Sequence, residues 1–71
     1  MTPDEIKAKL QIDGAEVRLN DTQGWHWINV TREHNGHRHT HTARLPLEPS
    51  DAQIKSTADA IERWWNETIN P

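Results

Sequence analysis

The sequence predicts a small α+β domain in which a short helix, a three-stranded antiparallel sheet and a long helix follow one another in the order α-β-β-β-α. Three observations predict this fold. Apolar and polar residues alternate over three consecutive stretches, an Asn35-Gly36 pair separates the second stretch from the third, and an apolar stripe with helical spacing follows residue 50. With 71 residues the chain forms a single small domain, residues 1–71.

The chain is expected to begin with a short helix. Thr2 is a suitable N-cap, Pro3 suits the first helical position, and Glu5 completes a capping box with Thr2. Asp13-Gly14 is a turn signal, so the helix should end near Gln11.

Three strands are expected after this helix. The stretch 15–20, AEVRLN, alternates apolar and polar residues, and the stretches 25–34 and 37–46 flank Asn35-Gly36. Asn-Gly between two such stretches is the strongest short-range signal for a two-residue hairpin turn. That turn places His34 opposite His37, and this register then decides which side chains share a face.

A second, longer helix is expected from about Asp51 to Asn66. Pro49 precedes it, Ser50 can cap it, and Gln53 stands at the capping-box position. Its apolar stripe, spaced by four, three and four residues, consists of Ile54, Ala58, Ile61 and Trp65.

The core is expected between this helix and one face of the hairpin. On that face the register gathers an apolar patch at the open end of the hairpin, made of Ile28, Val30, Ala43 and Leu45. Trp65 is expected to be buried against the patch and Trp64 to be partly buried. The histidines share this face, but most of them lie nearer the turn, beyond the expected reach of the helix.

The opposite, outward face of the hairpin is predicted to bind a partner. Its candidate binding residues are Trp25, Trp27, Arg38, Thr40, Thr42 and Arg44. Exposed tryptophan with arginine is typical of binding hot spots, and Trp27 faces Arg44 in the register, where a guanidinium can stack on an indole. In the alternative, the first helix folds over this face through Ile6 and Leu10 and covers both tryptophans.

Three histidines near the turn are the candidate metal ligands. His34, His37 and His39 share a face and lie close together across the hairpin, and neutral imidazole is a zinc ligand. A fourth ligand is missing, because the nearby Glu33 points to the opposite face. We therefore expect no bound metal and no cofactor, and a solvated strand surface in place of a metal site.

Charge and composition limit the classes of function that we expect for this chain. The net charge is −3 and there is no cysteine; residues 25–45 carry three arginines against one glutamate, whereas both flanks are acidic. The chain lacks a cysteine nucleophile, a glycine-rich phosphate loop and a pair of carboxylates flanking a cleft, so we expect that it is not an enzyme. No apolar run has the length of a membrane helix and the N-terminus does not resemble a signal peptide, so we expect a cytoplasmic monomer or weak homodimer with no membrane partner.

Residues 25–65 resemble the arm-type DNA-binding domain of phage tyrosine recombinases. The resemblance is one of layout: WHWINV, a hairpin turn at NG, the strand HRHTHTARL and the helix SDAQIKSTADAIERWW. In that family a three-stranded sheet enters the major groove and one helix backs it. The resemblance implies that the side chains facing DNA would be Trp27, Arg38, Thr40, Thr42 and Arg44.

In size and acidity the chain is also similar to small phage-encoded inhibitors, anti-CRISPR proteins among them. We expect a non-enzymatic binding module that docks on a protein partner and blocks it through the outward hairpin face. Its acidic ends suit the basic surface of a nucleic-acid-handling protein. The alternative is sequence-specific DNA binding by the three-stranded sheet.

Overall fold

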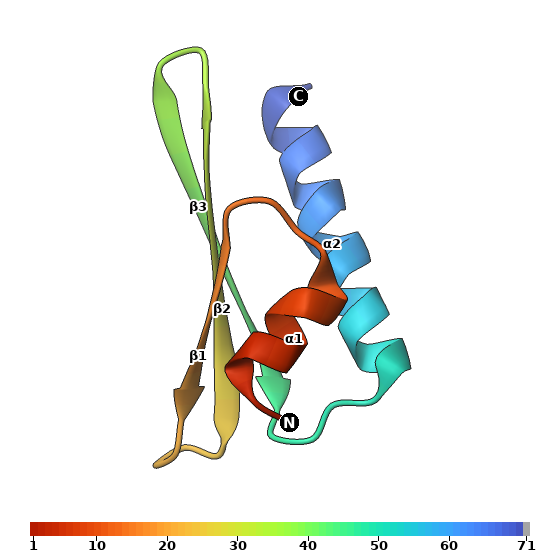
Figure 1. Cartoon of the computed structure of the whole chain (residues 1–71). Coiled ribbons are helices and arrows are strands. Elements are labelled where there is room, and N and C mark those ends of the chain that lie inside the picture. The colour runs from red at the N-terminus through yellow and green to blue at the C-terminus, as the bar shows by residue number, and fades with distance from the viewer. Residues whose placement is uncertain (71) are drawn as a thin grey trace.

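The computed structural model describes residues 1–70 and confirms the predicted α-β-β-β-α order (Figure 1). Its elements are α1 (Pro3–Leu10), β1 (Ala15–Asn20), β2 (Trp25–His34), β3 (His37–Pro46) and α2 (Asp51–Ile69). The strands form one antiparallel sheet in the order β1-β2-β3. Both helices lie on the same side of this sheet, so the molecule has two layers (Figure 1).

A capping box begins α1, as predicted. The Thr2 hydroxyl accepts a hydrogen bond from the Glu5 N–H, and the Glu5 carboxylate accepts one from the Thr2 N–H, both at 3.2 Å. The bond from the Thr2 backbone is the main reason that the pKa of Glu5 lies below its usual value. The charged form of Glu5 therefore helps to hold this cap at neutral pH, and that help is lost as the pH falls through the lowered pKa. Gln11 ends the helix in the left-handed conformation, at φ 53°.

A second capping box begins α2, and here too Ser50 and Gln53 exchange the two predicted hydrogen bonds. The predicted end of α2 at Asn66 is wrong, because the helix continues to Ile69. No proline or glycine interrupts the chain between residues 50 and 70. The Asn70 N–H donates to the Asn66 carbonyl at 2.9 Å, which closes the last turn.

The β2–β3 hairpin has the predicted register over its full length. His34 pairs with His37, and the pairing continues without a bulge to Trp25 opposite Pro46. Asn35 and Gly36 both have positive φ, 53° and 79°, as a type I′ turn requires. The sequence-based assignment of side chains to the two faces of the hairpin is therefore correct.

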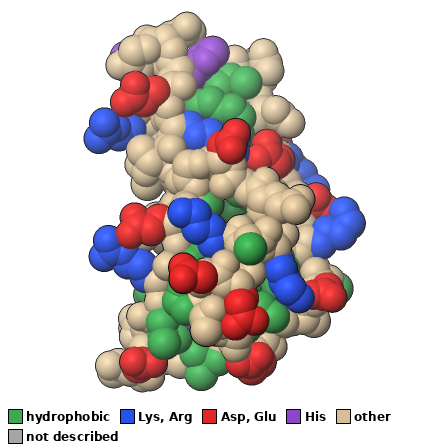
Figure 2. All heavy atoms as spheres, viewed as in Figure 1, with side chains coloured by type: hydrophobic (Ala, Val, Ile, Leu, Met, Phe, Trp, Pro, Cys, Tyr) green, Lys and Arg blue, Asp and Glu red, His purple; other side chains and the backbone are tan. Residues whose placement is uncertain are grey.

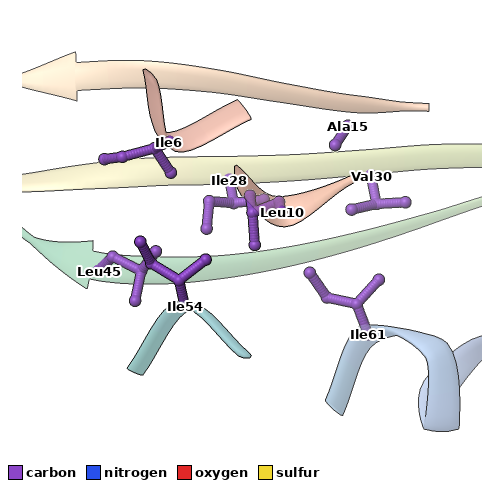
Figure 3. Packing of buried hydrophobic residues seen from close by; sticks show 8 residues of the cluster. All are labelled: Ile6, Leu10, Ala15, Ile28, Val30, Leu45, Ile54 and Ile61. Atoms are coloured by element: carbon purple, nitrogen blue, oxygen red, sulfur yellow. The ribbon is translucent and has the colours of Figure 1, made fainter. Parts of the chain in front are cut away.

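The core lies between the sheet and both helices (Figure 3). It contains the predicted residues Ile28, Val30 and Leu45 from the sheet and Ile54 and Ile61 from α2, each at most 3% exposed. Ala43 and Ala58 pack against this cluster. Helix α1 adds Ile6 and Leu10 to the same cluster, and β1 adds Ala15. Since α1 buries its apolar face on the α2 side of the sheet, it does not cover Trp25 and Trp27.

Candidate functional site

The sheet has a second face that neither helix covers (Figure 1), and we call it the open face. The strand register assigns thirteen side chains to it, because they alternate with the core residues: Glu16, Arg18, Asn20, Trp25, Trp27, Asn29, Thr31, Glu33, Arg38, Thr40, Thr42, Arg44 and Pro46. All six residues predicted to bind a partner are in this set. The structure therefore places them together on one surface.

Two tryptophans form the apolar centre of the open face. Trp25 and Trp27 are each half-buried, and their rings meet edge to face with centroids 5.7 Å apart and planes at 89°. The Arg44 guanidinium lies over the Trp25 ring, 4.4 Å from its centroid. The predicted stacking of Arg44 on Trp27 is therefore wrong. Arg44 is paired with Trp27 in the register, but its long side chain reaches the diagonal neighbour two residues along β2.

Trp25 also lines a shallow hollow at the end of the sheet. The hollow has a volume of about 300 Å³ and is lined by Gly24, Trp25, Arg44, Leu45 and Pro46. The indole N–H of Trp25 is covered by its neighbours and has no acceptor among residues 1–70.

Charges on the open face are mostly paired within it. Arg18 bonds to Glu16 at 2.7 Å, and Arg38 contacts Glu33 at 3.3 Å. Within residues 1–70, Arg44 is the arginine of this face that has no carboxylate partner. The open face thus combines two indoles with one arginine whose charge is available to bind a carboxylate or carbonyl of a partner.

Three of the five histidines, His34, His39 and His41, lie against α2, which corrects the expectation that the helix does not reach them. Trp64 stacks on His41 with centroids 4.9 Å apart and planes at 26°. Trp65 meets His34 and His39 edge to face, at 6.2 Å and 5.9 Å. Figure 2 shows a histidine beside an apolar patch at this end of the molecule. The C-terminal half of α2 lies alongside the hairpin tip, and its Trp64 and Trp65 form a second aromatic cluster with these histidines.

Trp64 is partly buried in this contact, as expected, and Trp65 is only partly buried too, whereas it was expected to be buried. Of the three candidate metal ligands, His34 and His39 face the Trp65 ring and His37 is exposed at the turn. Within residues 1–70 the structure contains no group of three or more His, Asp or Glu side chains that could hold a metal ion.

Arg32 links the hairpin to two other parts of the fold, and sequence reasoning did not single it out. Its guanidinium donates to the Asp13 carbonyl at 3.0 Å and to the Glu62 carboxylate at 2.9 Å. It also lies 5.4 Å from the centre of the Trp65 ring, and its side chain is only 14% exposed. An arginine on the core face of a predicted strand needs such partners. Its position on that face could therefore have identified Arg32 from the sequence as a linking residue.

His26 is fully buried on the core face, opposite Leu45. Its Nε2 lies 3.2 Å from the Leu47 carbonyl. Because a carbonyl only accepts, Nε2 is the donor of this hydrogen bond. Nδ1 has no hydrogen-bond partner among residues 1–70. The imidazole therefore ties the loop after β3 to β2, which is a structural role.

No protein-family model, curated protein or solved structure matches this chain. Neither helix within residues 1–70 has the length and apolarity that crossing a lipid bilayer requires.

Proposed function

We propose that this protein is a non-enzymatic binding module that docks on a partner protein through its open face. The observation that carries the proposal is the uncovered Trp25–Trp27 pair with Arg44 beside it. Tryptophan and arginine at the centre of a surface are the residue types most enriched in binding hot spots. On a small domain, partly exposed indoles on an uncovered sheet face are otherwise a liability for solubility.

Two further features support docking at this place. The hollow beside Trp25 can receive one side chain of a partner. The sheet is a rigid platform, because β2 pairs on both sides and its other face is packed on the core.

We further propose that the partner handles nucleic acid and that docking inhibits it or assists it. The acidic ends of the chain support this choice, since they are complementary to the basic surface of such a partner.

DNA binding by the open face is the second candidate. Its support is that three arginines share the face with Asn29, Thr40 and Thr42, which are residue types that contact phosphates and bases. Two of these arginines are already paired with Glu16 and Glu33, and both carboxylates would repel a phosphate backbone. Protein docking is therefore the function that the geometry favours.

Affinity capture from the source organism tests the proposal. The wild-type protein and the Trp27→Ala variant are immobilised side by side, and the retained proteins are compared. A protein retained by the wild type should be lost with Trp27→Ala, because truncation of a hot-spot residue costs about 2 kcal/mol or more of binding free energy.

The matched control is His37→Ala, which changes an exposed residue on the opposite face of the sheet. It should retain the partner at the wild-type level. Equal retention by Trp27→Ala would refute the open-face proposal. A capture that falls steeply with salt and depends on added DNA would favour the second candidate.

A further inference from the structure

β3 is a long, regular edge strand. All ten of its residues pair with β2 without a bulge, and no strand within residues 1–70 pairs with its other edge. Proteins usually shorten, bend or charge such edges, because exposed N–H and C=O groups accept strands from other chains. The opposite edge strand, β1, has only six residues.

The hairpin turn determines which backbone groups of β3 are free. In a two-residue hairpin the residues that flank the turn, His34 and His37, form a hydrogen-bonded pair. The odd-numbered residues of β3 therefore direct their amides toward β2. The N–H and C=O groups at the free edge belong to residues whose side chains lie on the open face: Arg38, Thr40, Thr42 and Arg44.

The charge of the β3 edge determines which kind of added strand it favours. β3 carries two arginines and three histidines and no acidic residue. Both arginines remain exposed. Arg44 has no carboxylate partner within residues 1–70, and Arg38, with 71% of its side chain accessible, has only a long, exposed contact of 3.3 Å with Glu33, which contributes little and can be exchanged for a carboxylate of the added strand. A strand that pairs with this edge is therefore bound most tightly if it carries carboxylates.

A second copy of the chain fits poorly. Two β3 strands paired about a two-fold axis at Thr40, His41 or Thr42 would place Arg38 of one copy directly or diagonally opposite Arg44 of the other. Like charges in such positions are unfavourable.

We propose that the outer edge of β3 binds an extended acidic segment of the partner protein as a fourth strand. This inference deepens the proposed function and rests on it, because it takes the partner of the open face to be a protein. Arg38 and Arg44 are six residues apart, which is about 20 Å along a strand. The segment therefore carries acidic residues six positions apart, with β-branched residues between them opposite Thr40 and Thr42. Its alternate side chains are apolar, since they fall on the side of the sheet where Trp64 and Trp65 lie.

A synthetic peptide tests strand addition without the natural partner. The probe is a fluorescein-labelled peptide, Ser-Val-Glu-Val-Thr-Val-Thr-Val-Glu-Val-Ser, and its binding is followed by fluorescence anisotropy. The wild-type protein should bind it, and should bind the version with both Glu replaced by Lys at least about tenfold more weakly. Absence of binding to the Glu peptide, or equal binding of the two peptides, would overturn the proposal.

Thr40→Pro tests the backbone contact. The Thr40 N–H points to the free edge, so proline removes a donor from the edge and leaves the ladder to β2 intact. Peptide binding should fall by about tenfold or more, while Thr40→Val, which keeps the N–H, should bind as the wild type does. Wild-type affinity in a folded Thr40→Pro variant would rule out strand addition.

Arg38→Glu supplies a second variant with an independent readout. It should lose the Glu peptide and gain affinity for the Lys peptide, and an unchanged preference would overturn the charge assignment. Leu19→Ala should bind the Glu peptide normally, because Leu19 is an exposed residue of β1, at the opposite edge of the sheet. The peptide assay reports failure of strand addition, whereas affinity capture reports failure of the tryptophan anchor.

Discussion

At the scale of single residues, Arg32 shows how one side chain can connect three segments. Its guanidinium bonds to the loop before β1 through Asp13 and to α2 through Glu62, and it faces Trp65. Only 14% of the Arg32 side chain is exposed, although the Glu62 side chain is 48% exposed. Hydrogen bonds of this kind to a charged group contribute more than a surface ion pair does.

Arg32→Ala should therefore lower the free energy of unfolding by about 1.5–3 kcal/mol. The matched control is Arg38→Ala, on the same hairpin, whose side chain is 71% exposed and whose ion pair with Glu33 is long, at 3.3 Å. That change should cost no more than about 1 kcal/mol. Urea unfolding of both variants measures the difference, and equal losses would show that Arg32 does not link the segments as described.

Residue-level partners were predicted least well from the sequence. The hairpin register correctly placed Arg44 opposite Trp27, yet the guanidinium lies on Trp25. A long side chain can reach direct and diagonal neighbours alike, and only the packing around it decides between them. The same reason applies to Arg32, whose partners Asp13 and Glu62 are far from it in the sequence.

At the scale of elements, prediction succeeded where the signal is local. Both capping boxes and the Asn35-Gly36 turn involve residues within a few positions of each other, and all of them are present. The end of α2 was placed too early because no local signal marks it. The side on which α1 packs could not be predicted from two apolar residues, Ile6 and Leu10, which suit either face of the sheet.

Two glycines at turns are expected to tolerate substitution differently. Both have positive φ, 78° at Gly14 and 79° at Gly36, so a side chain is strained at either position. A Cβ at Gly36 would meet no atom within 4 Å, whereas a Cβ at Gly14 would lie 2.5 Å from the Thr31 carbonyl oxygen. The Thr31 N–H also donates a hydrogen bond of 3.2 Å to the Gly14 carbonyl, which holds Gly14 close to β2.

Gly36→Ala should cost about 1–2 kcal/mol of stability, from backbone strain alone. Gly14→Ala should cost clearly more, because the backbone of β2 must also move away from the new methyl group. Thermal melts of the two variants, run in parallel, show which substitution lowers the melting temperature more. A Gly14→Ala protein as stable as Gly36→Ala would show that the loop before β1 does not approach β2 this closely.

At the scale of the whole molecule, both helices share one face of the sheet and leave the other open. This arrangement divides the apolar residues into two groups with different roles. Ile28, Val30 and Ile61 are fully buried and stabilise the fold, whereas Trp25 and Trp27 remain half-buried on the uncovered face. The proposed docking function depends on this division.

The unfolding free energy of the Trp27→Ala variant tests the division most directly. If Trp27 belongs to an open binding face, its truncation removes an edge-to-face aromatic contact and some strand propensity, and the loss should be about 1 kcal/mol. Ile61→Ala, a core control, should lose about 2–5 kcal/mol in the same urea titration. A loss of about 3–5 kcal/mol for Trp27→Ala, as for a buried tryptophan, would contradict the account and make Trp27 a core residue.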